Sequence, residues 1–143
     1  MTVPGIAVWG LGRHAIKRII PVLFSLKELS LVGICSRDQE SVIDCSSKWD
    51  CIGWTDHTEM LKSSRVDIVC IATPIGVHAN QVTQALEAGK HVWCEKPMSS
   101  SMGDSQKMAE ASLNTNSKTI IGYNYTKNPI VMHAKEIIEK GTI

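Results

Sequence analysis

Short apolar runs along the chain alternate with segments in which apolar residues recur every three or four positions. The apolar runs lie at residues 6–9, 29–35, 53–54, 66–73, 91–95 and 119–123, and they predict six strands. The periodic segments predict a helix that starts near residue 16 and further helices at 39–49, 56–61, 80–88, 99–113 and 129–140. Strands that alternate with helices are typical of an α/β fold with a parallel sheet. We therefore expect a doubly wound sheet with strand order 3-2-1-4-5-6.

The last predicted helix carries clear signals at both ends. Asn128 suits an N-cap, Pro129 suits the first helical position and Gly141 suits the C-terminal end. Its apolar residues cover more than a narrow stripe; they are Ile130, Val131, Ala134, Ile137 and Ile138. We expect one face of this helix to lie against the sheet or a neighbouring helix, and the remaining apolar residues to meet water unless another domain covers them.

A glycine-rich turn joins the first strand to the first helix. It consists of Gly10, Leu11, Gly12, Arg13, His14 and Ala15. The first glycine permits a sharp backbone reversal, the second lets a diphosphate approach the main chain without meeting a Cβ atom, and the alanine allows close packing of the helix on the strand. The helix start offers free N–H groups and the positive end of its dipole. The turn predicts a dinucleotide site, and the alternative is an ordinary glycine-rich turn without a ligand.

The end of the second strand is where such a fold distinguishes NAD from NADP. An NAD site usually has an acidic residue there, whereas this chain has Ser36 and Arg37. A guanidinium group holds a phosphate through paired hydrogen bonds, and Arg13 in the turn would add a second positive charge. We expect NADP to be preferred. Asp38 lies close by and favours NAD instead, and in a third interpretation both arginines are solvated surface residues.

The fourth strand ends in Ala72, Thr73 and Pro74, and His78 follows shortly after. Carboxyl ends of parallel strands face the ligand crevice, so we expect these residues to lie at the cofactor and Thr73 to touch ribose or phosphate. Alternatively, threonine and proline only terminate the strand. A single histidine in such a loop is more often hydrogen-bonded than catalytic, so His78 is assigned to the cofactor site and not to a catalytic base.

The fifth strand ends in Glu95, Lys96 and Pro97. Lys96 is expected where a nicotinamide ring would lie. A lysine between a cofactor and apolar walls releases its proton more readily than a free lysine, which suits a proton relay or a contact with a substrate oxygen. Glu95 would orient Lys96 or accept a backbone donor. The alternative is a surface lysine followed by a turn proline.

Composition narrows the functional classes. The 143 residues are 43% hydrophobic and 20% charged, with a net charge of +1, which fits one globular domain and gives no electrostatic case for nucleic acid or an anionic membrane surface. No apolar run approaches membrane-spanning length and the N-terminus lacks signal-peptide features, so we expect a cytoplasmic protein. The five cysteines form no Cys-x-x-Cys pair, and Cys35, Cys70 and Cys94 are expected in the core, with no metal site.

Four segments occur in an order that resembles a known family. They are residues 10–15, 72–78, 85–97 and 122–125, and the run Ala-Leu-x-Ala-Gly-Lys-His-Val followed by Glu-Lys-Pro is highly specific. Together they resemble the glucose–fructose oxidoreductase/inositol dehydrogenase (Gfo/Idh/MocA) family. The resemblance implies a Rossmann domain followed by a second α/β domain, and NAD(P)-linked oxidation or reduction of a sugar, polyol or sugar nucleotide. It also implies that Lys96 acts beside the nicotinamide and that Tyr123 and Asn124 belong to the cofactor site.

Two departures from the family pattern matter. Thr126 stands where members often have arginine, so the contact of that arginine is not carried over. The sequence also stops at residue 143, where the family continues into a domain that holds most substrate contacts, a catalytic histidine and the usual oligomer interface. We expect residues 1–126 to form the dinucleotide-binding domain, 127–143 to begin the connection, the full-length protein to be a homo-oligomer and this chain alone to be inactive. The alternative is a non-catalytic dinucleotide-binding or sensing module.

Overall fold

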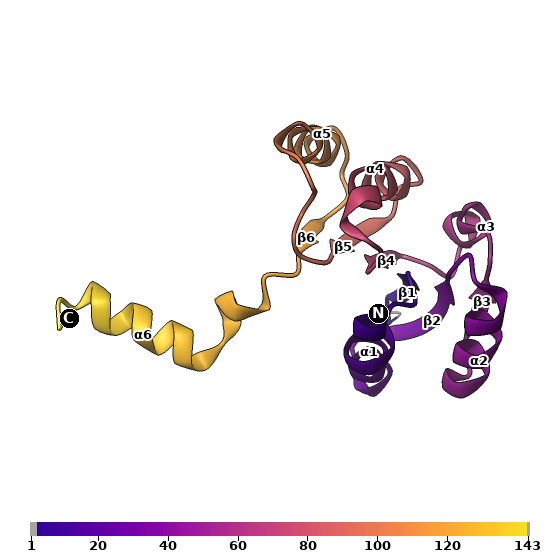
Figure 1. Ribbon diagram of the computed structural model, residues 1–143, viewed down its shortest axis with the longest axis horizontal. Coiled ribbons are helices and arrows are strands. Elements are labelled where there is room, and N and C mark those ends of the chain that lie inside the picture. The colour runs from indigo at the N-terminus through magenta and orange to yellow at the C-terminus, as the bar shows by residue number, and fades with distance from the viewer. Residues whose placement is uncertain (1–2, 143) are drawn as a thin grey trace.

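A six-stranded parallel sheet forms the centre of the computed structural model, which describes residues 3–142 (Figure 1). The strands are β1 (Gly5–Trp9), β2 (Ser30–Cys35), β3 (Ile52–Trp54), β4 (Ile68–Ile71), β5 (His91–Cys94) and β6 (Thr119–Ile121). They lie in the order β3-β2-β1-β4-β5-β6, and each neighbouring pair is parallel. The doubly wound α/β fold is therefore confirmed, with its switch point between β1 and β4.

Helices cover both faces of this sheet. The helices are α1 (Ile20–Ser25), α2 (Gln39–Trp49), α3 (His57–Lys62), α4 (His78–Glu87), α5 (Met102–Leu113) and α6 (Pro129–Glu139), with short turns of π-helix at Ala15–Ile19 and 3-10 helix at Ile75–Val77 and Asn124–Lys127. Figure 1 shows α4 and α5 on one side of the sheet and α1 and α2 on the other. The bounds of α2 match the prediction. The fourth strand is shorter than predicted at both ends, and the fifth and sixth strands end earlier than predicted because their last residues already belong to the loops at the carboxyl edge.

The strands alternate their side chains between two apolar layers. On β1, Ala7 packs in the layer that contains α3, α4 and α5, whereas Ile6 and Val8 pack in the layer that contains α1 and α2. All three are almost completely buried. Because both faces of the central strands are covered, these strands consist of nearly continuous apolar residues.

The helix after the glycine-rich turn begins with one wide π-helical turn. Pro21 has no backbone N–H and cannot continue the regular hydrogen-bond ladder, and the amide of Ile20 donates to the carbonyl of Ala15, five residues earlier. The sequence periodicity predicted the helix but not this turn. Ala15 and Ile20 are both fully buried, so the turn still packs its apolar side on the sheet.

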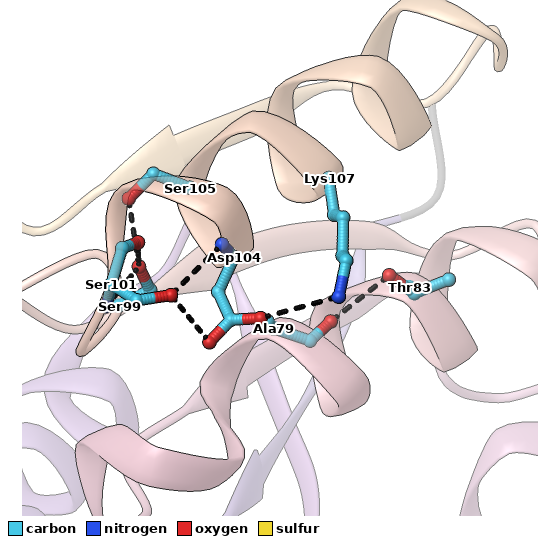
Figure 2. Close-up of polar contacts among 7 residues, drawn as sticks. All are labelled: Ala79, Thr83, Ser99, Ser101, Asp104, Ser105 and Lys107. Carbon is cyan, nitrogen blue, oxygen red and sulfur yellow. Dashed lines mark hydrogen bonds and ion pairs between the residues drawn. The ribbon is translucent and has the colours of Figure 1, made fainter.

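Side-chain caps start three of the helices. Asp56 accepts from the amide of Thr58 at 2.8 Å, and Asn128 accepts from the amide of Ile130 at 2.9 Å, as their positions predicted. At α5, Ser101 accepts from the amide of Asp104 at 3.1 Å and donates its hydroxyl to the same residue's carboxylate at 2.9 Å (Figure 2). Figure 2 also shows the 2.7 Å contact between the hydroxyls of Ser99 and Ser105, which ties the segment before α5 to its first turn.

The last helix stands apart from the rest of the molecule. Figure 1 shows α6 extending away from the sheet, and it contains no buried residue. Its apolar side chains are open to solvent, with Ile130 79% and Ile138 60% exposed. The expectation that one face lies on the sheet or a neighbouring helix is therefore wrong. The connection after β6 carries α6 outward instead of back across the sheet.

The cysteines occupy the expected places. Cys35, Cys70 and Cys94 are buried in strands, and all five cysteines are free thiols. Burial raises the pKa of Cys35 to about 12, and burial together with the nearby Glu95 carboxylate raises the pKa of Cys94 to about 12. Such thiols remain protonated at neutral pH and act as small core residues. Within residues 3–142, no helix has the length and apolar character required to cross a bilayer.

Candidate cofactor site

The glycine-rich turn is tightly packed at Gly10 and has free space around Gly12. Gly10 has φ +109° and its amide donates to the carbonyl of Cys35 at 2.8 Å, which holds the turn against the end of β2. A Cβ atom on Gly10 would lie 2.7 Å from Thr73 Cγ2 and 2.8 Å from the carbonyl carbon of Ala72, so only glycine fits there. A Cβ atom on Gly12 would meet nothing within 4 Å. The backbone at Gly12 is therefore accessible to a ligand group such as a diphosphate.

The residues after β2 include an exposed carboxylate with one local hydrogen bond and an exposed arginine. Asp38 precedes α2 and accepts from the hydroxyl of Ser41 at 2.6 Å, and this hydrogen bond is the main reason that the pKa of the exposed Asp38 carboxyl is lowered. Arg37 is exposed and forms no ion pair with the described residues. Ser36 is held in place because its amide donates to the carbonyl of Trp54 at 3.1 Å. The exposed Arg37 guanidinium is thus available at the strand end, the Ser36 hydroxyl accepts from the amide of Asp38 at 3.3 Å, and one oxygen of the exposed Asp38 carboxylate is bonded to Ser41.

The loop after β4 is bound by the first turn of α4. The hydroxyl of Thr73 donates to the side-chain oxygen of Gln81, and His78 Nε2 lies 2.8 Å from the carbonyl oxygen of Thr73. His78 is only 2% exposed, so its ring lies behind the crevice and not on its surface. Ala72 and Thr73 are half-buried and Pro74 is exposed, which places these three residues around the edge near the glycine-rich turn.

The loop after β5 faces the glycine-rich turn. Glu95 Oε2 lies 3.8 Å from His14 Nε2, and the carboxylate side chain is only 12% exposed. A Cβ atom on Gly122 would lie 2.6 Å from Glu95 Oε1, so glycine at that position leaves room for the carboxylate. Lys96 is exposed beside it and forms no ion pair with the described residues. Lys96 is therefore available to a ligand at the edge of the sheet.

A trough of about 570 Å³ begins at these loops and continues over the face of the sheet beside α1. Its polar end includes His14, Glu95, Tyr123 and Asn124, and its apolar part includes Ile68 and Trp93 among others. The trough brings together residues from the glycine-rich turn, the end of β5 and the segment after β6. These segments are far apart in the sequence and meet because all of them follow parallel strands.

The structure thus places most of the predicted site residues at one edge of the sheet, with His78 set behind it. Sequence reasoning did not identify Gln81 as a partner of Thr73 or Gly122 as the residue that makes room for Glu95. The predicted helix began at residue 80, whereas α4 begins at His78, so the sequence did not indicate that His78 and Gln81, three residues apart, share a face of that helix. In the part of the chain that the structure describes, no group of three or more metal-binding side chains is assembled.

A family model described as "Oxidoreductase family, NAD-binding Rossmann fold" (GFO_IDH_MocA) matches residues 5–123. The chain belongs to this family. Its similarity to a levoglucosan dehydrogenase from Pseudarthrobacter phenanthrenivorans is 36% identity over 89 residues, covering 62% of this chain and 23% of that protein.

Solved structures show the same fold. A 3-ketoreductase from Actinomadura kijaniata, in complex with TDP-benzene and NADP, superposes with a TM-score of 0.92 at 20% identity, over 99% of this chain and 45% of that one. The scyllo-inositol dehydrogenase from Lactobacillus casei, with bound NAD(H) and scyllo-inositol, gives 0.92 at 23% identity, over 99% and 42%. The chain therefore spans less than half the length of these relatives.

Proposed function

We propose that this chain binds NADP(H) across the carboxyl edge of its sheet and is the cofactor-binding part of an oxidoreductase that acts on a sugar, polyol or sugar nucleotide. The observation that carries the proposal is the turn after β1. Gly10 is locked against β2 and β4, while Gly12 exposes its backbone in front of a helix N-terminus. When bound, the nicotinamide would supply hydride chemistry with a substrate carbon.

Different residues around the carboxyl edge of the sheet bind different parts of the cofactor. The turn of residues 10–15 receives the diphosphate, and Ser36 and Arg37 receive the 2′-phosphate of NADP. This preference is supported by the exposed guanidinium of Arg37, which forms no ion pair with the described residues. The exposed Asp38 carboxylate keeps acceptor capacity beside its bond to Ser41, so NAD is the alternative at this strand end.

At the other end of the cofactor, Lys96 lies beside the nicotinamide and holds or moves the proton of the substrate hydroxyl. Its exposed ammonium group and its place next to Glu95 support this role. Tyr123 and Asn124 line the same trough and would contact the nicotinamide half or the substrate. These roles require a substrate held at reacting distance, which is the contribution we assign to a second domain.

The exposure of the last helix supports a division of the chain into two parts. We assign residues 1–126 to the dinucleotide-binding domain and 127–143 to the start of a connection to a substrate domain. The support is that α6 carries apolar residues on the outside of the described structure and that the relatives are more than twice as long. We further propose a cytoplasmic, homo-oligomeric enzyme, consistent with buried free thiols and the exposed apolar helix.

Calorimetric titration with NADPH and NADH tests the proposal. The parent protein is expected to bind NADPH more tightly than NADH, and Arg37→Ala is expected to lose about ten-fold or more in NADPH affinity with little change for NADH, because a hydrogen bond between charged groups contributes about 1.5–3 kcal/mol. Arg65→Ala, which removes an exposed arginine at the opposite end of the sheet, is the matched control. Equal affinities of the parent for the two dinucleotides would contradict the NADP assignment.

A further inference from the structure

One buried polar side chain has no role in the site as described so far. His78 is the first residue of α4, and among residues 3–142 it is the only buried side chain that is polar or charged. Burial of a polar ring is unfavourable unless its nitrogens find hydrogen-bond partners. The hydrogen-bond partners of His78 therefore indicate which segments of the chain its ring holds in place.

Both partners are backbone carbonyls in the loops of the cofactor edge. His78 Nε2 lies 2.8 Å from the oxygen of Thr73, directly after β4, and Nδ1 lies 3.1 Å from the oxygen of Pro97, directly after β5. An imidazolium donates from both nitrogens and bonds both loops, whereas a neutral imidazole donates from one nitrogen and bonds one loop. Because both nitrogens face the protein, neither is available to a ligand.

The contact between His78 and Pro97 lies next to Lys96, the residue before Pro97. Lys96 precedes Pro97, is exposed, and forms no ion pair with the described residues that would fix its side chain. Its position depends on its backbone. On one side Glu95 donates its amide to Ile71 at 2.9 Å, and on the other side the carbonyl of Pro97 meets the His78 ring. His78 thus holds the backbone on the far side of Lys96.

A second residue of α4 also contacts Thr73. Gln81, one turn after His78 on α4, accepts the Thr73 hydroxyl, so α4 holds the side chain of Thr73 through Gln81 and its backbone through a protonated Nε2 of His78. The methyl group of Thr73 lies 2.7 Å from the position that a Cβ atom on Gly10 would occupy, so Thr73 packs directly against the glycine-rich turn. The first turn of α4 therefore connects the glycine-rich turn, the end of β4 and the end of β5.

We propose that His78 is a positioning residue that sets Lys96 relative to the nicotinamide half of the cofactor by joining the loops after β4 and β5. This inference rests on the proposed function. It predicts that loss of the ring weakens contacts to the nicotinamide half while contacts to the adenosine half, made by residues 10–15 and 36–37, remain.

The test compares NADPH with adenosine 2′,5′-bisphosphate, which carries the adenosine half alone. His78→Phe removes both ring nitrogens while keeping an aromatic side chain. It is expected to weaken NADPH binding about five- to ten-fold and to change adenosine 2′,5′-bisphosphate binding less than two-fold. Leu86→Ala, a core truncation about two turns further along the same helix, is the control for general destabilisation and should leave both affinities unchanged. If His78→Phe does not fold, His78→Gln, which can still donate to one carbonyl, is measured against the same two ligands.

A double-mutant cycle separates positioning from a merely structural role. If His78 acts through Lys96, the loss caused by His78→Phe should largely disappear in a Lys96→Ala background. Additive losses, equal weakening of both ligands, or unchanged NADPH affinity in a folded His78 variant would each overturn the positioning role. A parent that binds neither ligand would overturn the proposed function as well, so the two failures are distinguishable.

Discussion

Replacement of Gly12 by valine should impair cofactor binding while leaving the stability of the fold unchanged. In the folded chain, a Cβ atom at this position meets nothing within 4 Å, and the backbone of Gly12 does not require the left-handed region. The stability of the variant should therefore stay within about 0.5 kcal/mol of the parent, as expected for a surface substitution. A branched side chain would nevertheless stand where a diphosphate must approach the main chain.

The expected loss of affinity follows from the hydrogen bonds that the diphosphate would give up. Two charge-assisted bonds from backbone amides contribute at least about 3 kcal/mol together, which corresponds to a loss of more than about 100-fold. Calorimetry with NADPH measures the affinity, and urea unfolding measures the stability. Gly103→Val is the matched control, because Gly103 also has no neighbour within 4 Å of its Cβ position and lies on α5. A folded Gly12→Val protein that binds NADPH as tightly as the parent would refute the assignment of the turn.

Three further results are expected. Gly10→Ala should destabilise the fold by at least about 2 kcal/mol in urea unfolding, because φ +109° is unfavourable for alanine and the methyl group would lie 2.7 Å from Thr73; unchanged stability would show that the turn relaxes easily. The pKa of the Cys94 thiol rises from 9.0 to about 12 on folding, so the thiol ionises at lower pH in the unfolded chain and the free energy of unfolding should fall between pH 9 and pH 12. Cys94→Ala should reduce that fall, as measured by urea unfolding across this pH range. An identical pH profile for the variant and the parent would contradict the raised pKa. The exposed apolar side of α6 should cause concentration-dependent association in sedimentation, which Ile138→Lys reduces, whereas a strictly monomeric parent would argue against an interface there.

The central fold could be predicted from the sequence because local signals agree with the global arrangement. The runs at residues 6–9 and 66–73 are apolar on both faces, which suits only strands buried between two layers, and residues 39–49 have helical periodicity that the structure reproduces as α2. The caps Asp56 and Asn128 act as predicted because capping depends only on residues two or three positions apart.

Features that depend on distant contacts could not be predicted in the same way. The direction in which α6 leaves the sheet is one such feature, because periodicity predicts a helix but not where it packs. The ring of His78 was expected at the cofactor, and only the three-dimensional positions of Thr73 and Pro97 show that both nitrogens face backbone carbonyls. Likewise, the need for glycine at position 122 depends on Glu95, 27 positions earlier in the numbering of the chain.

The most direct test of a cofactor site at this edge is an NMR titration of the ¹⁵N-labelled protein with NADPH, repeated with adenosine 2′,5′-bisphosphate. We expect saturable binding of both ligands, with both shifting the amide signals of residues 10–15 and 36–37, and NADPH alone shifting those of Lys96 and Tyr123. Absence of saturable NADPH binding, or shifts confined to residues away from the carboxyl edge of the sheet, would contradict the account.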